Sequence, residues 1–261
     1  MYTFHVDETG RSGKEKFFYI GGLVADENQF ITATARTKEI RNKFNYSQTD
    51  PFKFSSNSRP KERVSIEDWT ASKREALELI KELDIKFLAL YIHHSIANPL
   101  KRTEGVVWNM QNLFRHYAKI FLQDEPGAVC LDRVDEKWSN NEIAKIAQSQ
   151  IPFKDEIIGI PEIIHYSFTD HRFSHFNSLV DIALGTFHYC CESAFAENKD
   201  ERIEKVETML SLVYPCFARD EATGLVTGTG LLQQPNSPAS KYEHEYNTLQ
   251  AFLADHKPAQ Q

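Results

Sequence analysis

The stretch FHVDETGRSGKEKFFYIGGLVA, residues 4–25, decides how we interpret the rest of this 261-residue chain. Its first part alternates apolar and polar residues up to Asp7, which is typical of a short strand. Its last part, residues 16–25, is almost continuously apolar, which is typical of a buried strand. Because a polar, glycine-containing segment separates the two parts, we expect a hairpin with a long loop.

Helices and strands alternate after this hairpin. Apolar runs predict three more strands, at 85–92, 128–131 and 162–168. Helical spacing and capping residues predict helices at 27–44 (with Asp26 as N-cap), 70–83, 103–123, 139–150, 176–190 and 200–213. A hairpin followed by such an alternation predicts an α/β fold, a mixed β-sheet of about five strands flanked by helices.

The hydrophobic pattern weakens after Pro215. We therefore expect the folded domain to span residues 1–215, and residues 216–261, rich in Gly, Pro, Gln, Ser and Asn, to form a partly ordered C-terminal tail. No apolar run reaches the roughly 18 residues that a membrane span needs. With no signal-peptide pattern and four cysteines without a CxxC pair, we expect a cytoplasmic protein without membrane contact.

Three aspartates stand in apolar surroundings. Asp7 and Asp132 each end an apolar strand, and Asp181 lies within an apolar helix. Acids are rarely fully buried unless they are paired or bind a metal, so these three are expected to meet at one point. Carboxylates suit hard cations such as Mg²⁺ or Mn²⁺. Two such ions about 3.5–4 Å apart can activate water and stabilise the leaving oxygen of a phosphodiester.

Each acid taken singly also has an ordinary structural explanation. Asp7 can begin the turn of the hairpin, since Asp is common in turns. Asp132 can be a loop residue after its strand, and Asp181 can lie on the polar face of an amphipathic helix.

Three motifs resemble the DUF3800 family over roughly residues 2–195. VDETGRSG at 6–13, with the apolar strand after it, resembles the family's "DESG" opening. LDRVDEK at 131–137 resembles its middle acidic strand end. HYSFTDHRFSHFNSLVDIALG at 165–185 resembles its closing pattern of a strand, a "DS" pair and a helix of the form LQxAD.

The resemblance implies an RNase H-like fold and, from that fold, a metal-dependent nuclease or a close relative. Several members of the family sit beside bacterial mobile-element or phage-defence genes. Carried over by position, Asp7, Asp132 and Asp181 are the metal carboxylates. Glu8 is the second acid of the opening motif and a catalytic helper, and Asp170 is the acid of the "DS" pair.

The chain departs from the family pattern in three places. Thr9 replaces a Ser and keeps its hydroxyl, His171 replaces the Ser after Asp170, and Asn177 and Ser178 stand at a Leu-Gln pair. These changes affect one rim of the expected site rather than its three main acids. His171 or His175 is also a candidate proton shuttle, because histidine titrates near neutral pH.

A basic loop between the first two helices is the candidate substrate contact. It carries Lys53, Arg59 and Lys61 beside Phe52 and Phe54, a combination that can track phosphates and stack on bases. A solvated loop is the alternative, since exposed Lys and Arg are common.

Three functions follow from these residues. The first is a two-metal nuclease that uses Mg²⁺ or Mn²⁺ and binds DNA or RNA through a local basic patch, since the net charge of −7 disfavours broad non-specific binding. The second is a binding or regulatory module that keeps the fold without catalysis. The third is a phosphatase that uses Asp7 as a phosphorylated nucleophile. The sequence leaves open the oligomeric state and the choice between DNA and RNA.

Overall fold

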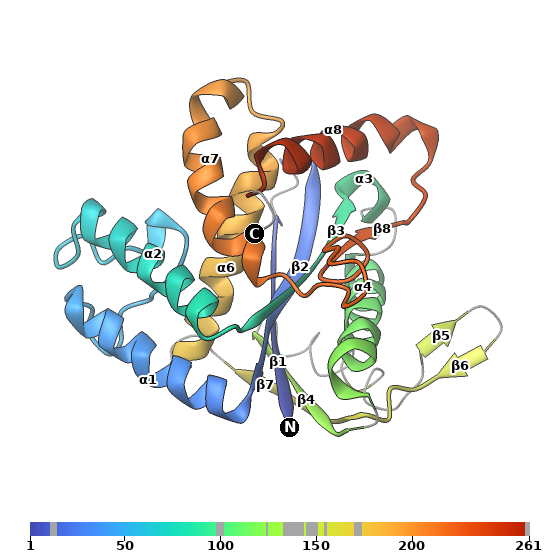
Figure 1. Cartoon of the computed structure of the whole chain (residues 1–261), viewed down its shortest axis with the longest axis horizontal. Coiled ribbons are helices and arrows are strands. Elements are labelled where there is room, and N and C mark those ends of the chain that lie inside the picture. Colours follow the sequence, from blue (N-terminus) through green and yellow to red (C-terminus); the bar gives the residue numbers. More distant parts are fainter. Residues whose placement is uncertain are drawn as a thin grey trace.

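A six-stranded mixed sheet runs through the centre of the computed structural model (Figure 1), which describes residues 1–10, 15–97, 102–123, 125–132, 144, 151–153, 156–169 and 174–258. The strand order is β7-β4-β1-β2-β3-β8. The strands are β1 (Tyr2–Thr9), β2 (Phe17–Asp26), β3 (Lys86–His93), β4 (Gly127–Asp132), β7 (Ile163–Thr169) and β8 (Leu231–Gln234). Two short strands, β5 (Ile151–Phe153) and β6 (Glu156–Ile158), form a separate antiparallel pair that the sequence did not predict.

The predicted hairpin is confirmed and forms the middle of the sheet. β1 and β2 pair antiparallel from Tyr2 opposite Asp26 to Thr9 opposite Tyr19, and β3 pairs antiparallel with β2. β4 lies parallel to β1 on its other side, β7 lies parallel to β4, and β8 lies parallel to β3. The expected fold class, a mixed sheet flanked by helices, is therefore confirmed, with six strands instead of about five.

Helices cover both faces of this sheet. They are α1 (Glu27–Lys43), α2 (Ile66–Glu82), α3 (His94–Ala97), α4 (Arg102–Tyr117) continued by a π-helical turn (Ala118–Leu122), α6 (His175–Ser193), α7 (Lys199–Val213) and α8 (Ser240–His256). α1, α2, α6 and α7 lie on one face, and α4 lies on the other (Figure 1). None of the helices that the structure describes is long and apolar enough to cross a membrane.

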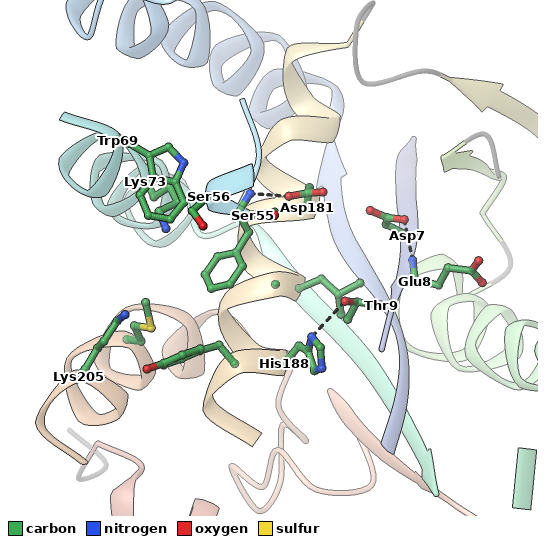
Figure 2. A pocket seen from close by; sticks show the side chains of 15 residues that line it. Asp7, Glu8, Thr9, Ser55, Ser56, Trp69, Lys73, Asp181, His188 and Lys205 are labelled. Carbon is green, nitrogen blue, oxygen red and sulfur yellow. Dashed lines mark hydrogen bonds between the residues drawn. The ribbon is translucent and has the colours of Figure 1, made fainter. Parts of the chain in front are cut away.

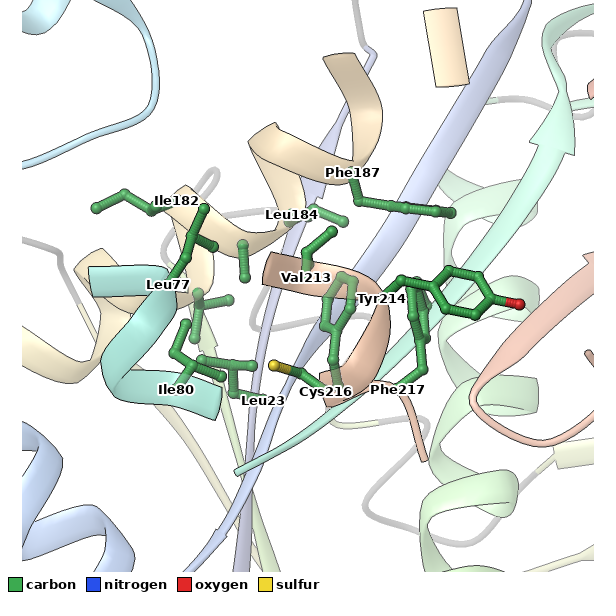
Figure 3. Close-up of a cluster of buried hydrophobic side chains, with 14 of the residues drawn as sticks. Leu23, Leu77, Ile80, Ile182, Leu184, Phe187, Val213, Tyr214, Cys216 and Phe217 are labelled. Atoms are coloured by element: carbon green, nitrogen blue, oxygen red, sulfur yellow. The ribbon is translucent and has the colours of Figure 1, made fainter. Parts of the chain in front are cut away.

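One apolar cluster fastens α2 and α6 to the sheet (Figure 3). Leu23 of β2, Ile80 of α2 and Phe187 of α6 are buried there. Phe217, which follows α7, packs against Phe87 in a tilted arrangement and against Phe187 edge to face, with ring centroids 4.7 and 5.1 Å away. These contacts fix α2, α6 and α7 relative to one another on one side of the sheet, which is also the side of the candidate site.

The segment after residue 215 differs from its prediction as a partly ordered tail. β8 adds an edge strand beside β3, and Tyr246, Leu249 and Leu253 of α8 are buried. The Tyr246 hydroxyl donates to the Gln234 carbonyl at 2.6 Å and accepts from the His93 backbone N–H at 2.8 Å. A strand of four residues and a helix with few buried positions leave little periodic signal, which explains why the sequence did not reveal them.

One predicted helix begins earlier in the structure than expected, and another lies almost entirely outside the described residues. α2 begins four residues before its predicted start, because Ser65 caps it by accepting the Asp68 N–H at 2.9 Å. The helix predicted at 139–150 falls almost entirely outside the described residues, with only residue 144 described, as helical.

Two hydrogen bonds hold α6 along β1. His5 Nδ1 lies 3.0 Å from Asn177 Oδ1 near one end, and Thr9 Oγ1 lies 3.1 Å from His188 Nδ1 near the other. His5 is also packed between the rings of Phe30 and Phe176, with centroids 5.2 and 4.7 Å away. The side chains of β1 between these two bonds are therefore held against the middle of α6.

This arrangement predicts an acid-sensitive contact. Burial, the largest cause, lowers the pKa of His5 to about 4, below its ordinary 6.5. A group with a depressed folded pKa contributes stability above its unfolded pKa and loses it as the pH falls, here between 6.5 and 4. We expect His5→Phe to be more stable relative to the wild type at pH 4.5 than at pH 7 by about 2 kcal/mol, measured as the difference in their free energies of unfolding in urea at the two pH values. The same change at the exposed His244 should leave the acid response unaltered, and an unaltered response in His5→Phe would contradict the prediction.

Candidate functional site

The three predicted metal carboxylates lie on the same side of the sheet. Val6 pairs with Leu131 across the parallel strands β1 and β4, so Asp7 and Asp132 follow at the same level. Side chains alternate along a strand, so Asp7 shares the face of β1 on which His5 and Thr9 bond to α6. Asp181 lies in α6 between those two bonds, and Figure 2 shows the Asp7 and Asp181 carboxylates turned toward one another.

Asp7 carries the electrostatic strain of this arrangement. Burial raises its pKa to about 7, and the negative charges of Asp132 and Asp181 act in the same direction. The Glu8 backbone N–H, which donates to Asp7 Oδ1 at 2.7 Å, and the charge of Lys53 oppose the increase without cancelling it. The three acids therefore lie close enough for their charges to interact, and the cluster favours either a proton or a cation at neutral pH.

The basic loop contacts α6 through Asp181. One carboxylate oxygen of Asp181 accepts the backbone N–H of Phe54 at 2.7 Å, and the other lies 3.7 Å from Lys53 Nζ. A Cβ at Gly185, one turn further along α6, would lie 2.5 Å from the Phe54 ring, so glycine is what lets the loop come this close. The predicted substrate residue Lys53 thus stands beside a predicted metal ligand.

The remaining predicted site residues are placed less directly. The Glu8 side chain points away from Asp181 (Figure 2), as its position next to Asp7 on a strand requires. Arg59 donates to the Val64 carbonyl at 2.5 Å and holds its own loop, and Lys61 is exposed. Neither basic residue lines the pocket beside the acids. Asp170 and His171 lie outside the described residues.

The acids suit a cation by charge, but they are not arranged as a finished metal site. Across the described ranges, no group of three or more His, Cys, Asp or Glu side chains is placed to hold a metal ion. Both oxygens of Asp181 already have partners, one of them the Lys53 ammonium. A metal held here would therefore need Lys53 to move away from Asp181 and the carboxylates to draw together.

A pocket of about 440 Å³ opens beside Asp7 and Asp181 (Figure 2). Its volume is within the range of roughly 300–1,000 Å³ that is usual for ligand pockets. Asp7 and Asp181 line one end. The other end is basic and aromatic and includes Lys73, Lys205, Trp69 and Tyr189.

Sequence reasoning missed this second end of the pocket. Lys73 gave one signal, because it precedes the buried Ala76 and Leu77 by three and four residues and so shares their helix face. A lysine on an apolar face is unusual. Lys205 comes from α7, distant in sequence, and nothing in its local pattern indicates a site.

Comparison with known proteins gives structural likenesses but no relative by sequence. No family model matches the chain, and no curated protein does. The solved structure of ribonuclease H2 from Pyrococcus horikoshii OT3 aligns with 97% of this chain and 99% of that chain, at 16% identity and a TM-score of 0.33. Values this low transfer neither an activity nor site residues. The DUF3800 resemblance and the roles of the acids therefore stay predictions.

Proposed function

We propose that this protein is a metal-dependent nuclease that hydrolyses phosphodiester bonds of DNA or RNA. The observation that supports the proposal most is that Asp7, Asp132 and Asp181, from three separate elements, lie close enough for their charges to interact, and that Asp7 and Asp181 line a pocket with a basic far end. Repelling carboxylates in a half-buried place are typical of a site that a divalent cation completes.

In this proposal the residues of the site have separate roles. Asp7 and Asp132, side by side on parallel strands, would hold Mg²⁺ or Mn²⁺, with Asp181 opposite them on α6. The bound ion would supply activation of water and neutralisation of phosphate charge. The Phe54 N–H orients the Asp181 carboxylate, and Lys53 is close enough to balance its charge or contact a substrate phosphate.

A non-catalytic binding module of the same fold is the second candidate. It is favoured by the absence of a ready-made metal group among the described residues, and by the contacts that already occupy both oxygens of Asp181. The third function, a phosphatase using Asp7 as nucleophile, is disfavoured. The pKa of about 7 leaves Asp7 partly protonated at neutral pH, and two neighbouring acids would repel a phosphate.

The nuclease proposal predicts metal-dependent cleavage that requires the acids. With Mg²⁺ or Mn²⁺, the full chain should cleave at least one of single-stranded, duplex or hybrid nucleic acid. Asp7→Asn and Asp181→Asn should each slow cleavage at least about 100-fold, which corresponds to roughly 2.7 kcal/mol of transition-state stabilisation. Rates of labelled-strand cleavage measure this.

The matched control for this experiment is Asp255→Asn, an exposed acid on α8 that should cleave at the normal rate. Cleavage that persists in chelator, or that Asp7→Asn leaves unchanged, would count against the proposal. A complete lack of cleavage on every substrate, in a protein that still binds nucleic acid, would favour the binding module.

The repulsion at Asp7 also predicts a stability trade-off. A raised folded pKa means that the stabilising contribution of Asp7 is present below pH 3.8 and is lost as the pH rises through about 7. In the absence of metal, Asp7→Asn should raise the free energy of unfolding by about 2 kcal/mol at pH 8 and by much less at pH 4. Urea unfolding at the two pH values measures this gain.

Bound metal should favour the stability of the wild type over that of Asp7→Asn. Mn²⁺ at pH 8 should raise the melting temperature of the wild type and not that of Asp7→Asn, because binding to the folded state alone stabilises it. An equal rise in both proteins would place the ion elsewhere.

A further inference from the structure

The basic end of the pocket contains a buried lysine that lacks an acidic partner. Lys73 is 6% exposed, and within the part of the chain that the structure describes it forms no ion pair or hydrogen bond. Its ammonium instead lies over two rings, 3.1 Å from the Trp69 centroid and 4.6 Å from that of Phe54. Charged groups are rarely buried unless paired, so this position calls for an anion.

A second positive charge faces the same space. Lys205 of α7 lines the pocket, and its ammonium lies 4.7 Å from the Tyr189 ring centroid. The charge of Lys205 adds to burial, the larger cause, in lowering the pKa of Lys73 to about 7, while Asp181 acts in the opposite direction. Two lysines drawn from α2 and α7 that repel one another are poorly explained by stability alone.

Uncharged donors line the same end. The indole Nε1 of Trp69 is buried and, among the described residues, has no hydrogen-bond partner, although an indole N–H can only donate. Ser55 and Ser56 are exposed on the loop that borders the pocket, where their hydroxyls can donate to a ligand. Ammonium, indole and hydroxyl donors grouped in this way match a ligand with several acceptor oxygens.

We propose that Lys73, Lys205, Trp69, Ser55 and Ser56 form a phosphate-binding subsite that holds the phosphate group of a nucleotide next to the acids. Tyr189 also lines the pocket, but the Lys205 ammonium lies over its ring, so the phosphate and not the base carries the recognition. The substrate class rests on the proposed nuclease function, and the binding of phosphate itself does not. In the proposed nuclease, the subsite would hold one nucleotide of the substrate strand next to the phosphodiester bond that is cleaved beside Asp7 and Asp181.

Equilibrium binding without metal tests the subsite. The full chain in chelator at low salt is titrated calorimetrically with inorganic phosphate, adenosine 5′-monophosphate and adenosine. We expect phosphate and the monophosphate to bind, and adenosine to bind at least about tenfold more weakly than the monophosphate, because charge-assisted hydrogen bonds carry the affinity. Equal binding of adenosine and the monophosphate would overturn the proposal.

Variants assign the binding to these residues. Lys73→Met should weaken monophosphate binding at least about tenfold, and Lys205→Met should weaken it less because Lys205 is exposed. Lys81→Met, an exposed lysine at the end of the same helix, is the matched control and should bind normally. Normal binding by both Lys73→Met and Lys205→Met would overturn the subsite. So would tighter binding of an acidic peptide than of the monophosphate, which would indicate a protein ligand.

Thermal unfolding distinguishes a binding role of Lys73 from a structural one. Without ligand, Lys73→Met should melt close to the wild type, because the loss of the ammonium–ring contacts is offset by the removal of a buried charge that has no ion pair among the described residues. A lower melting temperature together with normal monophosphate binding would show that Lys73 is structural and overturn its assignment. If Lys73→Met does not fold, Lys205→Met and Trp69→Phe carry the same binding test.

The outcome also separates the two proposals. Monophosphate binding without any cleavage activity would support the subsite and not the nuclease. Metal-dependent cleavage without monophosphate binding at Lys73 would do the reverse.

Discussion

The fastening of α6 onto β1 is the constraint on which the candidate site depends. A histidine–asparagine contact near one end and a threonine–histidine contact near the other set the position of the helix along the strand. Asp7 and Asp181 fall between them and are thereby held face to face. The pair is costly by itself, since burial, the largest cause, and the charges of Asp181 and of Asp132 on β4 raise the pKa of Asp7. The apolar packing beneath α6 stabilises the arrangement, so the repulsion is maintained by the rest of the fold.

Much of the fold could be predicted because its central elements have strong periodic signals. The alternation before Asp7, the apolar run of β2 and the helical spacing of α6 each fixed an element, and the strand–helix alternation fixed the fold class. The two elements after residue 215 could not be predicted in the same way. β8 is short and gains its stability from pairing with β3, and α8 buries only a few side chains, so both depend on contacts that a local pattern does not record.

The candidate site was predictable only where polar residues interrupt apolar segments. Asp7, Asp132 and Asp181 are conspicuous for that reason, and Lys53 was noticed because its loop is basic. The far end of the pocket gives almost no such signal, because Lys73 and Lys205 are brought together by the packing of α2 and α7 on α6. The basic character of this end becomes apparent from the burial of Lys73 and from the Trp69 N–H, which has no hydrogen-bond partner among the described residues. Both are properties of the folded chain. Acids at one end and donors with no partner among the described residues at the other give the pocket a strong internal polarity.

The alternation of β1 has a consequence for how the protein responds to acid. His5 and Asp7 are two residues apart, so they face the same helix, yet folding shifts their proton affinities in opposite directions. Acidification penalises the folded state through the imidazole and relieves it through the carboxylate over much the same interval. The metal-free wild type can therefore show a nearly level stability profile across mildly acidic pH, in which two large titrations mask each other. Only a chain that lacks one of the two groups would reveal the other.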